Sequence, residues 1–148
     1  MFRASDFEFR IHKFMATLKV PPHNEEAESS VLGAILIDKD AISIVSGLIS
    51  ERDFYNPING IIFSAMLSLY EQGKPIDVLT LASQIKKNKT KEKIESSYLA
   101  DLVNMVPTAA NIEHYAILIK EGATKRSLIK IGSEIVETAF MEEKEVGD

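Results

Sequence analysis

Residues 53–81 constrain the fold most, because they encode a helix that needs other protein on more than one side. Asn56 is a good N-cap, and Pro57 suits the first helical position, where a missing N–H costs nothing. Apolar residues then follow at helical spacing on two faces: Ile58, Ile61, Ile62, Ala65, Met66 and Leu69 on one, and Phe63, Leu67 and Tyr70 on the other. A helix that is apolar on two faces must be surrounded by other elements. We therefore expect this helix at the centre of the domain, with Gly73 and Pro75 ending it.

Four shorter apolar runs precede or follow the central helix. Each comes after a residue that can cap a helix: Asn24, Asp40, Asp77 or Thr80, and Ser96 or Ser97. The apolar members of the first two runs are Val31, Leu32, Ala34, Ile35 and Leu36, then Ile42, Ile44, Val45, Leu48 and Ile49. Those of the last two are Val78, Leu79, Leu81, Ala82 and Ile85, then Tyr98, Leu99, Leu102, Val103 and Val106, before Pro107. The sequence thus predicts an all-α fold, a compact bundle of about five to six helices around the central one.

The last predicted helix is long. It can start at Thr108 or Asn111 and run to about Glu142, which is about 45 Å and more than the width of a small domain. Its second half carries an apolar stripe with two flanking residues: Leu128, Ile131, Ile135 and Ala139, beside Ile129 and Val136. Exposed to water, this stripe is unfavourable, so it predicts a partner helix, a second subunit or another protein. We expect this helix to be the first half of a helical hairpin, with the chain ending inside that hairpin.

The two ends of the chain show weaker patterns. Phe7, Phe9 and Ile11 alternate with polar residues, as in a short strand, but no partner strand is visible. We therefore expect a disordered or loosely docked arm there. The predicted organisation has three parts: a flexible N-terminal extension over residues 1–19, a globular helical domain over 20–110, and the long helix with a frayed tail over 111–148.

Composition excludes several classes of function. The chain has no cysteine, so disulfides and thiolate metal sites are absent, as suits the reducing cytoplasm, where we expect this protein. Its net charge of -5 argues against sequence-independent binding to DNA phosphates, and no apolar run is long enough to cross a bilayer. His12, His23 and His114 lack the spacing of metal ligands, and no glycine opens a phosphate-binding loop. We expect no catalytic residues, metal or cofactor here, and we interpret Glu25, Glu26 and Glu28 as acids at a helix start.

One basic run, Lys86 to Lys93, could bind nucleic acid. It has no interleaved aromatic residues and ends among acids, so lysines at a helix end followed by a solvated loop explain it more simply.

Several segments, in order, resemble a known family: Pro21 to Ala34, Asp53-Phe54-Tyr55, Ile61-Ile62-Phe63, Leu69 to Asp77, Leu79-Thr80-Leu81, and Val106 to Glu113 with Tyr115-Ala116. The set covers roughly Val20 to Phe140 and is similar to the N-terminal domain of bacterial replicative DNA helicases of the DnaB type. That domain is the collar of a hexameric, ATP-driven helicase whose motor lies in a C-terminal domain. ATP and Mg²⁺ would therefore belong to a motor that this chain lacks.

The resemblance also implies partners and surfaces. The family's collars pair as dimers through their hairpins, three dimers form a ring, and the ring recruits primase; a helicase loader is a further possible partner, and DNA is contacted only through the parent ring. The residues in positions that resemble the hairpin and primase-facing surface are Tyr98, Leu128, Ile129, Ile131, Ile135 and Val136. For Tyr98, packing in the core is an equally good interpretation. Two other hypotheses stay open: a free-standing helical adaptor that binds primase or a loader, and a weak DNA-binding module.

Overall fold

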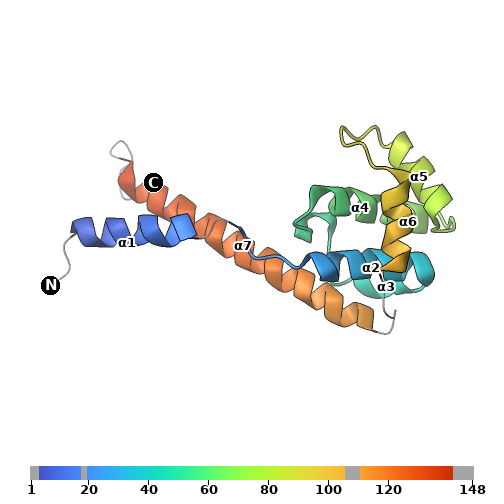
Figure 1. The fold of residues 1–148 in the computed structure, drawn as a ribbon, viewed down its shortest axis with the longest axis horizontal. Helices are drawn as coiled ribbons and strands as arrows, with labels where there is room; N and C mark the ends of the chain where they lie inside the picture. Colours follow the sequence, from blue (N-terminus) through green and yellow to red (C-terminus); the bar gives the residue numbers. More distant parts are fainter. Residues whose placement is uncertain (1–3, 18–19, 106–110, 142–148) are drawn as a thin grey trace.

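The computed structural model describes residues 4–17, 20–105 and 111–141, and all regular structure in these residues is helical. The elements are α1 (Ala4–Thr17), α2 (Glu25–Ile37), α3 (Ala41–Val45), the 3₁₀ turn η1 (Glu51–Asp53), α4 (Pro57–Glu71), α5 (Val78–Lys87), α6 (Ser96–Asn104) and α7 (Ile112–Phe140). Figure 1 shows α2 to α6 gathered around the first half of α7, whose second half projects away from them. The predicted all-α class is confirmed. The proposed end of a helix at Pro107 and the tail after Met141 lie outside the described residues.

The most enclosed helix is α2, which lies against α3, α4, α6 and α7. Every residue from Val31 to Ile35 is buried. We expected the helix after Asn56 to be enclosed on all sides. That helix, α4, does bury Ile62, Phe63, Ala65, Met66 and Leu69, but Tyr70 at its end is 47% exposed. The centre is therefore shared by α2 and α4.

Most predicted helix boundaries are confirmed by their hydrogen bonds. The Asn24 side chain accepts from the Ala27 backbone N–H (2.8 Å), and Asn56 does the same for Ile58 (3.0 Å). Gly73 has a left-handed φ of 64°. Its N–H and that of Lys74 donate back to the carbonyls of Tyr70 and Leu69 (both 2.9 Å), which closes α4.

One predicted helix start is wrong: the residue before α6 is Glu95, so Ser96 is already helical. Asp40 does precede α3 as its N-cap residue, but it makes no side-chain capping bond. Instead the Asp38 carboxylate accepts from the Asp40 backbone N–H (3.0 Å) within the turn. The helix α3 that follows ends at Val45, earlier than expected, and Ile44, which we predicted to be buried, is 50% exposed. Since α3 is so short, only one of its faces can pack on the core.

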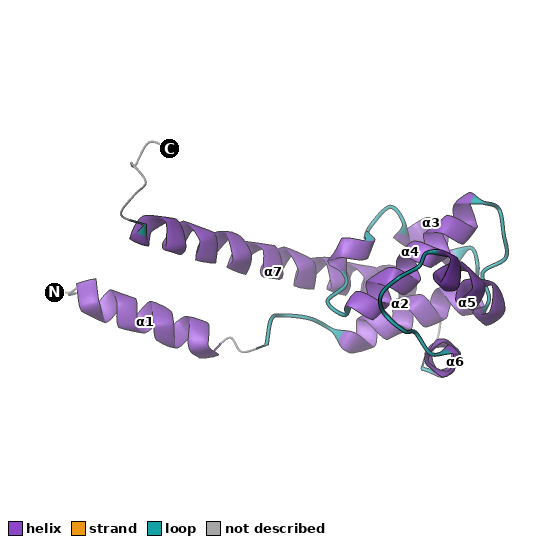
Figure 2. Cartoon of the chain, turned by 90° about the horizontal axis from the view of Figure 1, so that it is seen from above, coloured by secondary structure: helices purple, strands orange, loops and turns teal. Residues whose placement is uncertain are grey.

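The N-terminal segment also differs from the prediction. Residues 4–17 form the helix α1 and not the strand that the alternation suggested, because a helix satisfies its backbone hydrogen bonds without a partner. A flexible or loosely docked arm stays a prediction. Both views of the chain place α1 along the projecting half of α7, away from the globular part (Figures 1 and 2).

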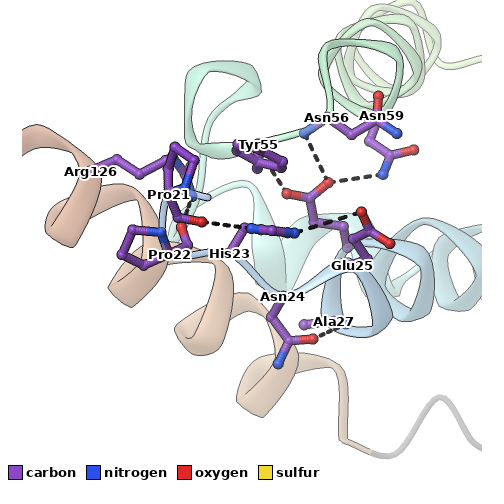
Figure 3. Close-up of polar contacts among 11 residues, drawn as sticks. Pro21, Pro22, His23, Asn24, Glu25, Ala27, Tyr55, Asn56, Asn59 and Arg126 are labelled. Atoms are coloured by element: carbon purple, nitrogen blue, oxygen red, sulfur yellow. Dashed lines mark hydrogen bonds and ion pairs between the residues drawn. The ribbon is translucent and has the colours of Figure 1, made fainter. Parts of the chain in front are cut away.

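A buried carboxylate joins three helices inside the globular part. Glu28 of α2 is 2% exposed and accepts hydrogen bonds from the backbone N–H groups of Tyr55 (2.6 Å) and Asn56 (3.3 Å) and from Asn59 Nδ2 (2.9 Å). Figure 3 shows these donors converging from the start of α4. The Tyr98 hydroxyl of α6 donates to Asn59 Oδ1 (2.7 Å), so the network reaches a third helix. Glu28 is thus a structural residue as well as an acid near a helix start.

Gly60 is required for the approach of η1 to α4. An added Cβ would lie 2.8 Å from the Glu51 carbonyl oxygen, which belongs to the backbone and cannot rotate away. Gly47, in contrast, has open space, with Ile44 O at 3.9 Å as its nearest atom.

We predict that Gly60→Ala lowers the free energy of unfolding by about 1–3 kcal/mol, because η1 must shift to relieve the clash. Gly47→Ala is the matched control and should leave stability unchanged or raise it slightly. Urea unfolding monitored by circular dichroism measures both variants. Equal stabilities would mean that the contact between η1 and Gly60 tolerates a methyl group.

We also predict a dependence of stability on alkaline pH. Burial raises the pKa of the Tyr98 phenol above its ordinary value of 10.0, and the charge of Glu28 adds to this. A raised pKa in the folded state means that the stability contribution is complete below pH 10.0 and is lost as the pH rises through the folded-state pKa. Tyr98→Phe should therefore cost about 1 kcal/mol at neutral pH but show a shallower loss of stability above pH 10.0. Parallel curves for the two proteins would contradict this role.

Candidate protein interaction surface

The projecting half of α7 carries a row of apolar side chains that lack cover. Leu128 is 65% exposed, Ile131 53% and Ile135 65%, and their spacing places them on one side of the helix. We call these three residues the α7 apolar face. Ile129, at 36% exposure, and the half-buried Val136 flank it. All five lie in the second half of α7, and this half extends beyond the globular part (Figure 2).

The first half of α7 is held in the core by apolar packing and by two basic side chains. Ile112, Ala116 and Ile119 are buried. One turn later, the Lys120 ammonium pairs with the Asp53 carboxylate at 3.1 Å. These contacts orient α7 where it leaves the domain.

The last fixed point is Arg126. Its guanidinium donates to the Pro22 carbonyl (2.8 Å) and to the Asp53 carbonyl (2.6 Å), and it lies 5.6 Å from the centre of the Tyr55 ring. The His23 ring stacks on the same Tyr55 ring, with 4.0 Å between the ring centres (Figure 3). Because the planar guanidinium binds two carbonyls at once, it fixes the direction of α7. The α7 apolar face starts directly after this anchor.

Tyr98 lies elsewhere. It belongs to α6, which packs against α2 and α5, and Figure 1 places α6 far from the projecting half of α7. Its ring is half-buried and its hydroxyl bonds to Asn59. The structure thus brings five of the six predicted interface residues onto one helix and leaves Tyr98 apart. An interface role for Tyr98 stays a prediction, alongside its place in the Glu28 network.

A neighbouring hollow was not predicted from the sequence. It has a volume of about 310 Å³ and is lined by Leu48, Ile117, Lys120, Glu121, Thr124 and Lys125. Ile117, Glu121 and Thr124 precede Leu128 at helical spacing, so the hollow continues the α7 apolar face toward the globular part. Sequence reasoning missed it because it depends on α3 and α7 lying together. The exposed fraction of Ile117, 43%, belongs to the same surface.

The basic run Lys86 to Lys93 covers the last two residues of α5 and part of the loop that leads to α6. Lys86 and Lys87 end α5, where positive charge favours the helix dipole, as expected. Lys93 pairs with Glu95 at 2.9 Å, and this hydrogen bond and charge raise the pKa of the lysine. Lys86, Lys89, Lys91 and Lys93 line a hollow of about 450 Å³ together with Glu92 and Glu95, so the charge there is mixed.

The part of the chain that the structure describes contains no group of three His, Asp or Glu side chains placed to hold a metal ion. None of its helices is long and apolar enough to cross a membrane. Both carboxylate oxygens of the buried acid Glu28 accept hydrogen bonds from N–H donors, which gives this side chain a structural role.

Comparison with solved structures supports the fold in detail. The N-terminal domain of the DnaB helicase from Mycobacterium tuberculosis superposes with a TM-score of 0.81 at 36% identity, covering 86% of this chain and 91% of that one. The N-terminal domain of the DnaB helicase from Helicobacter pylori, whose structure was described together with its interactions with primase, gives a TM-score of 0.70 at 30% identity, covering 78% and 91%.

Curated relatives agree with these structures. The replicative DNA helicase DnaC of Bacillus subtilis is 39% identical over 131 residues, which are 88% of this chain and 29% of that protein. The replicative DNA helicase DnaB of Geobacillus stearothermophilus is 36% identical over 129 residues, 86% and 28% respectively. The chain thus spans less than a third of these relatives. Because residues 20–121 match the family profile described as "DnaB-like helicase N terminal domain", this chain belongs to the family of N-terminal domains of DnaB-type replicative helicases.

Proposed function

We propose that this chain is the assembly and docking domain of a replicative DNA helicase, and that it self-associates through the α7 apolar face. The observation that carries this proposal is that face itself: Leu128, Ile131 and Ile135 lie on one side of a rigidly anchored helix and are each more than half exposed. An apolar stripe of this kind is unfavourable in water unless another surface covers it.

A second copy of the chain suits this surface. Two α7 helices that pair in antiparallel fashion around Leu128 would bring the end of one helix to the hollow beside Ile117 of the other. The apolar contact would then continue past the three central residues onto the globular part. In the parent protein, such dimers would combine into the hexameric ring.

Docking of primase is the second part of the proposal. The Helicobacter pylori domain, which is similar over 78% of this chain, is described together with its interactions with primase. We assign primase binding to the same class of exposed surface, including the projecting end of α7. A helicase loader is a further partner of the parent ring in this proposal.

Strand separation would belong to the parent protein. The relatives are more than three times as long as the part that this chain covers, and ATP and Mg²⁺ would bind in that additional region. The sequence of this chain contains no phosphate-binding loop that fits ATP. The alternative of a free-standing adaptor shares the same surface but has no observation of its own in its favour.

We predict that Ile135→Glu weakens self-association at least about tenfold, because a charge would be buried in the interface between the two α7 helices, which we call the seam. Ser133→Glu is the matched control, since it adds the same charge on the opposite side of the helix. Analytical ultracentrifugation over a range of concentrations measures both. An unchanged dissociation constant for Ile135→Glu would count against α7 as the seam.

A primase-binding experiment tests the docking role. We expect the cognate primase to bind the wild-type chain in isothermal titration calorimetry and to bind Ile131→Glu more weakly, with circular dichroism confirming that the variant is folded. If primase binds neither protein, docking belongs to another part of the parent helicase.

The DNA-binding alternative makes a separate prediction. If Lys86 to Lys93 contacted phosphates, single-stranded DNA would bind at low salt with an affinity that falls steeply as salt increases. We expect a flat fluorescence-anisotropy titration at low salt instead, because Glu92 and Glu95 lie among the lysines. Saturable, salt-sensitive binding would revive that alternative.

A further inference from the structure

The helix α1 precedes the residues that match the family and runs along the projecting half of α7. The match begins at residue 20, whereas α1 spans Ala4–Thr17. Figures 1 and 2 both show α1 running along the projecting half of α7, with the N-terminal end of α1 toward the C-terminal end of α7. The two helices thus run in opposite directions, but α1 is not among the closely packed helix pairs of this structure, and Phe7 on α1 and Ile135 on α7 are both exposed. The structure therefore shows α1 undocked.

The anchor at Arg126 determines where α1 can reach. Because the Arg126 guanidinium holds the Pro22 carbonyl at 2.8 Å, the chain that follows α1 enters the domain at the middle of α7. α1 has 14 residues and extends about 21 Å. The part of α7 from Arg126 to Phe140 also extends about 21 Å, so α1 has the length needed to cover it.

The apolar residues on α1 suit this partner. Phe7 is 62% exposed and Ile11 is half-buried, and they lie four residues apart on one side of the helix. Because α1 ends at Thr17 and residues 20–22 are not helical, an antiparallel arrangement places α1, and with it Ile11, opposite the outer part of the projecting half, which contains Ile135 and Ala139. It brings Phe7 to the end of α7, where Phe140 is 56% exposed. Each helix thus offers the other an apolar side that has little cover of its own.

Close approach between the two helices is also possible. Gly132 lies in the middle of the projecting half of α7, and an added Cβ there would meet no atom within 4 Å. A glycine on a helix surface gives a neighbouring helix room to come close. Gly132 lies between Ile131 and Ile135 in the sequence and next to the α7 apolar face on the helix surface.

We infer that α1 docks on the α7 apolar face of its own chain and forms an intramolecular hairpin that competes with a second copy for the same surface. This inference rests on the proposed self-association through α7. α1 acts as a strap: when it is docked, the seam is covered, and when it is released, the seam is free to pair. Only chains with α1 released can pair, so the apparent affinity of self-association falls in proportion to the fraction of chains that are open.

The first test changes α1 alone. Phe7→Asp should release the strap and raise the association constant for self-association by up to about tenfold. Phe9→Asp is the matched control, because Phe9 is also exposed (70%) but lies on the opposite side of α1 from Phe7. Equal effects of the two variants, or weaker association of Phe7→Asp because α1 belongs to the seam between copies, would overturn the inference.

The second test measures docking without relying on self-association. The chain has no cysteine, so two introduced cysteines would be the only thiols that react with the cross-linker. With a short bismaleimide at low protein concentration, Glu8→Cys with Ala139→Cys should cross-link within one chain. Glu8→Cys with Glu137→Cys, at the same level but on the opposite side of α7, should cross-link several-fold less.

The outcomes separate the two proposals. Cross-linking within a chain in a protein that stays monomeric would support α1 docking while removing self-association through α7. Cross-links through Ala139→Cys that join two chains, without any within one chain, would support self-association and overturn α1 docking. Equal cross-linking of both cysteine pairs would also overturn it, because α1 would then have no preferred side of α7.

Discussion

The buried carboxylate of Glu28 is the interaction on which the arrangement of the helices depends. A charge removed from water is tolerated only when hydrogen bonds replace the lost hydration, and here three N–H donors do so. Two of these are backbone groups of Tyr55 and Asn56, so the carboxylate fixes the start of α4 against α2. Asn59 in turn accepts a hydrogen bond from the Tyr98 hydroxyl, which connects α6 to the same network. One side chain on the most enclosed helix thus sets the relative positions of three helices.

The same connection leads to the functional surface. Tyr55, whose backbone binds Glu28, faces the Arg126 guanidinium, and the neighbouring Asp53 accepts both from Arg126 and from Lys120. The loop before α4 therefore holds α7 at the point where it leaves the domain. Beyond that point the described part of α7 projects from the domain with its apolar side exposed, and we propose that this side is available to a second copy, to primase or to α1. A rigid base with a free helical end suits a domain that assembles a larger machine.

Two apolar surfaces near each other give the molecule a choice of partners. In our proposal the α7 apolar face is covered by a helix from the same chain or from another one, and the balance between them depends on concentration. An intramolecular helix has a high effective concentration but a small contact area, whereas a second copy brings a whole helix and the hollow beside Ile117. Assembly within the parent ring would raise the local concentration of other copies and favour the second arrangement.

The sequence by itself determined the helical class, most helix boundaries and the presence of an uncovered stripe on α7, because caps such as Asn24 and Asn56 and the spacing of Leu128, Ile131 and Ile135 act over only a few residues. Only the tertiary structure decided that α2 shares the centre, that Gly60 must stay small and that Tyr98 bonds to Asn59, 39 residues away. It also showed that residues 4–17 are helical and lie beside α7. These features depend on contacts between distant segments, which local propensity and periodicity do not encode.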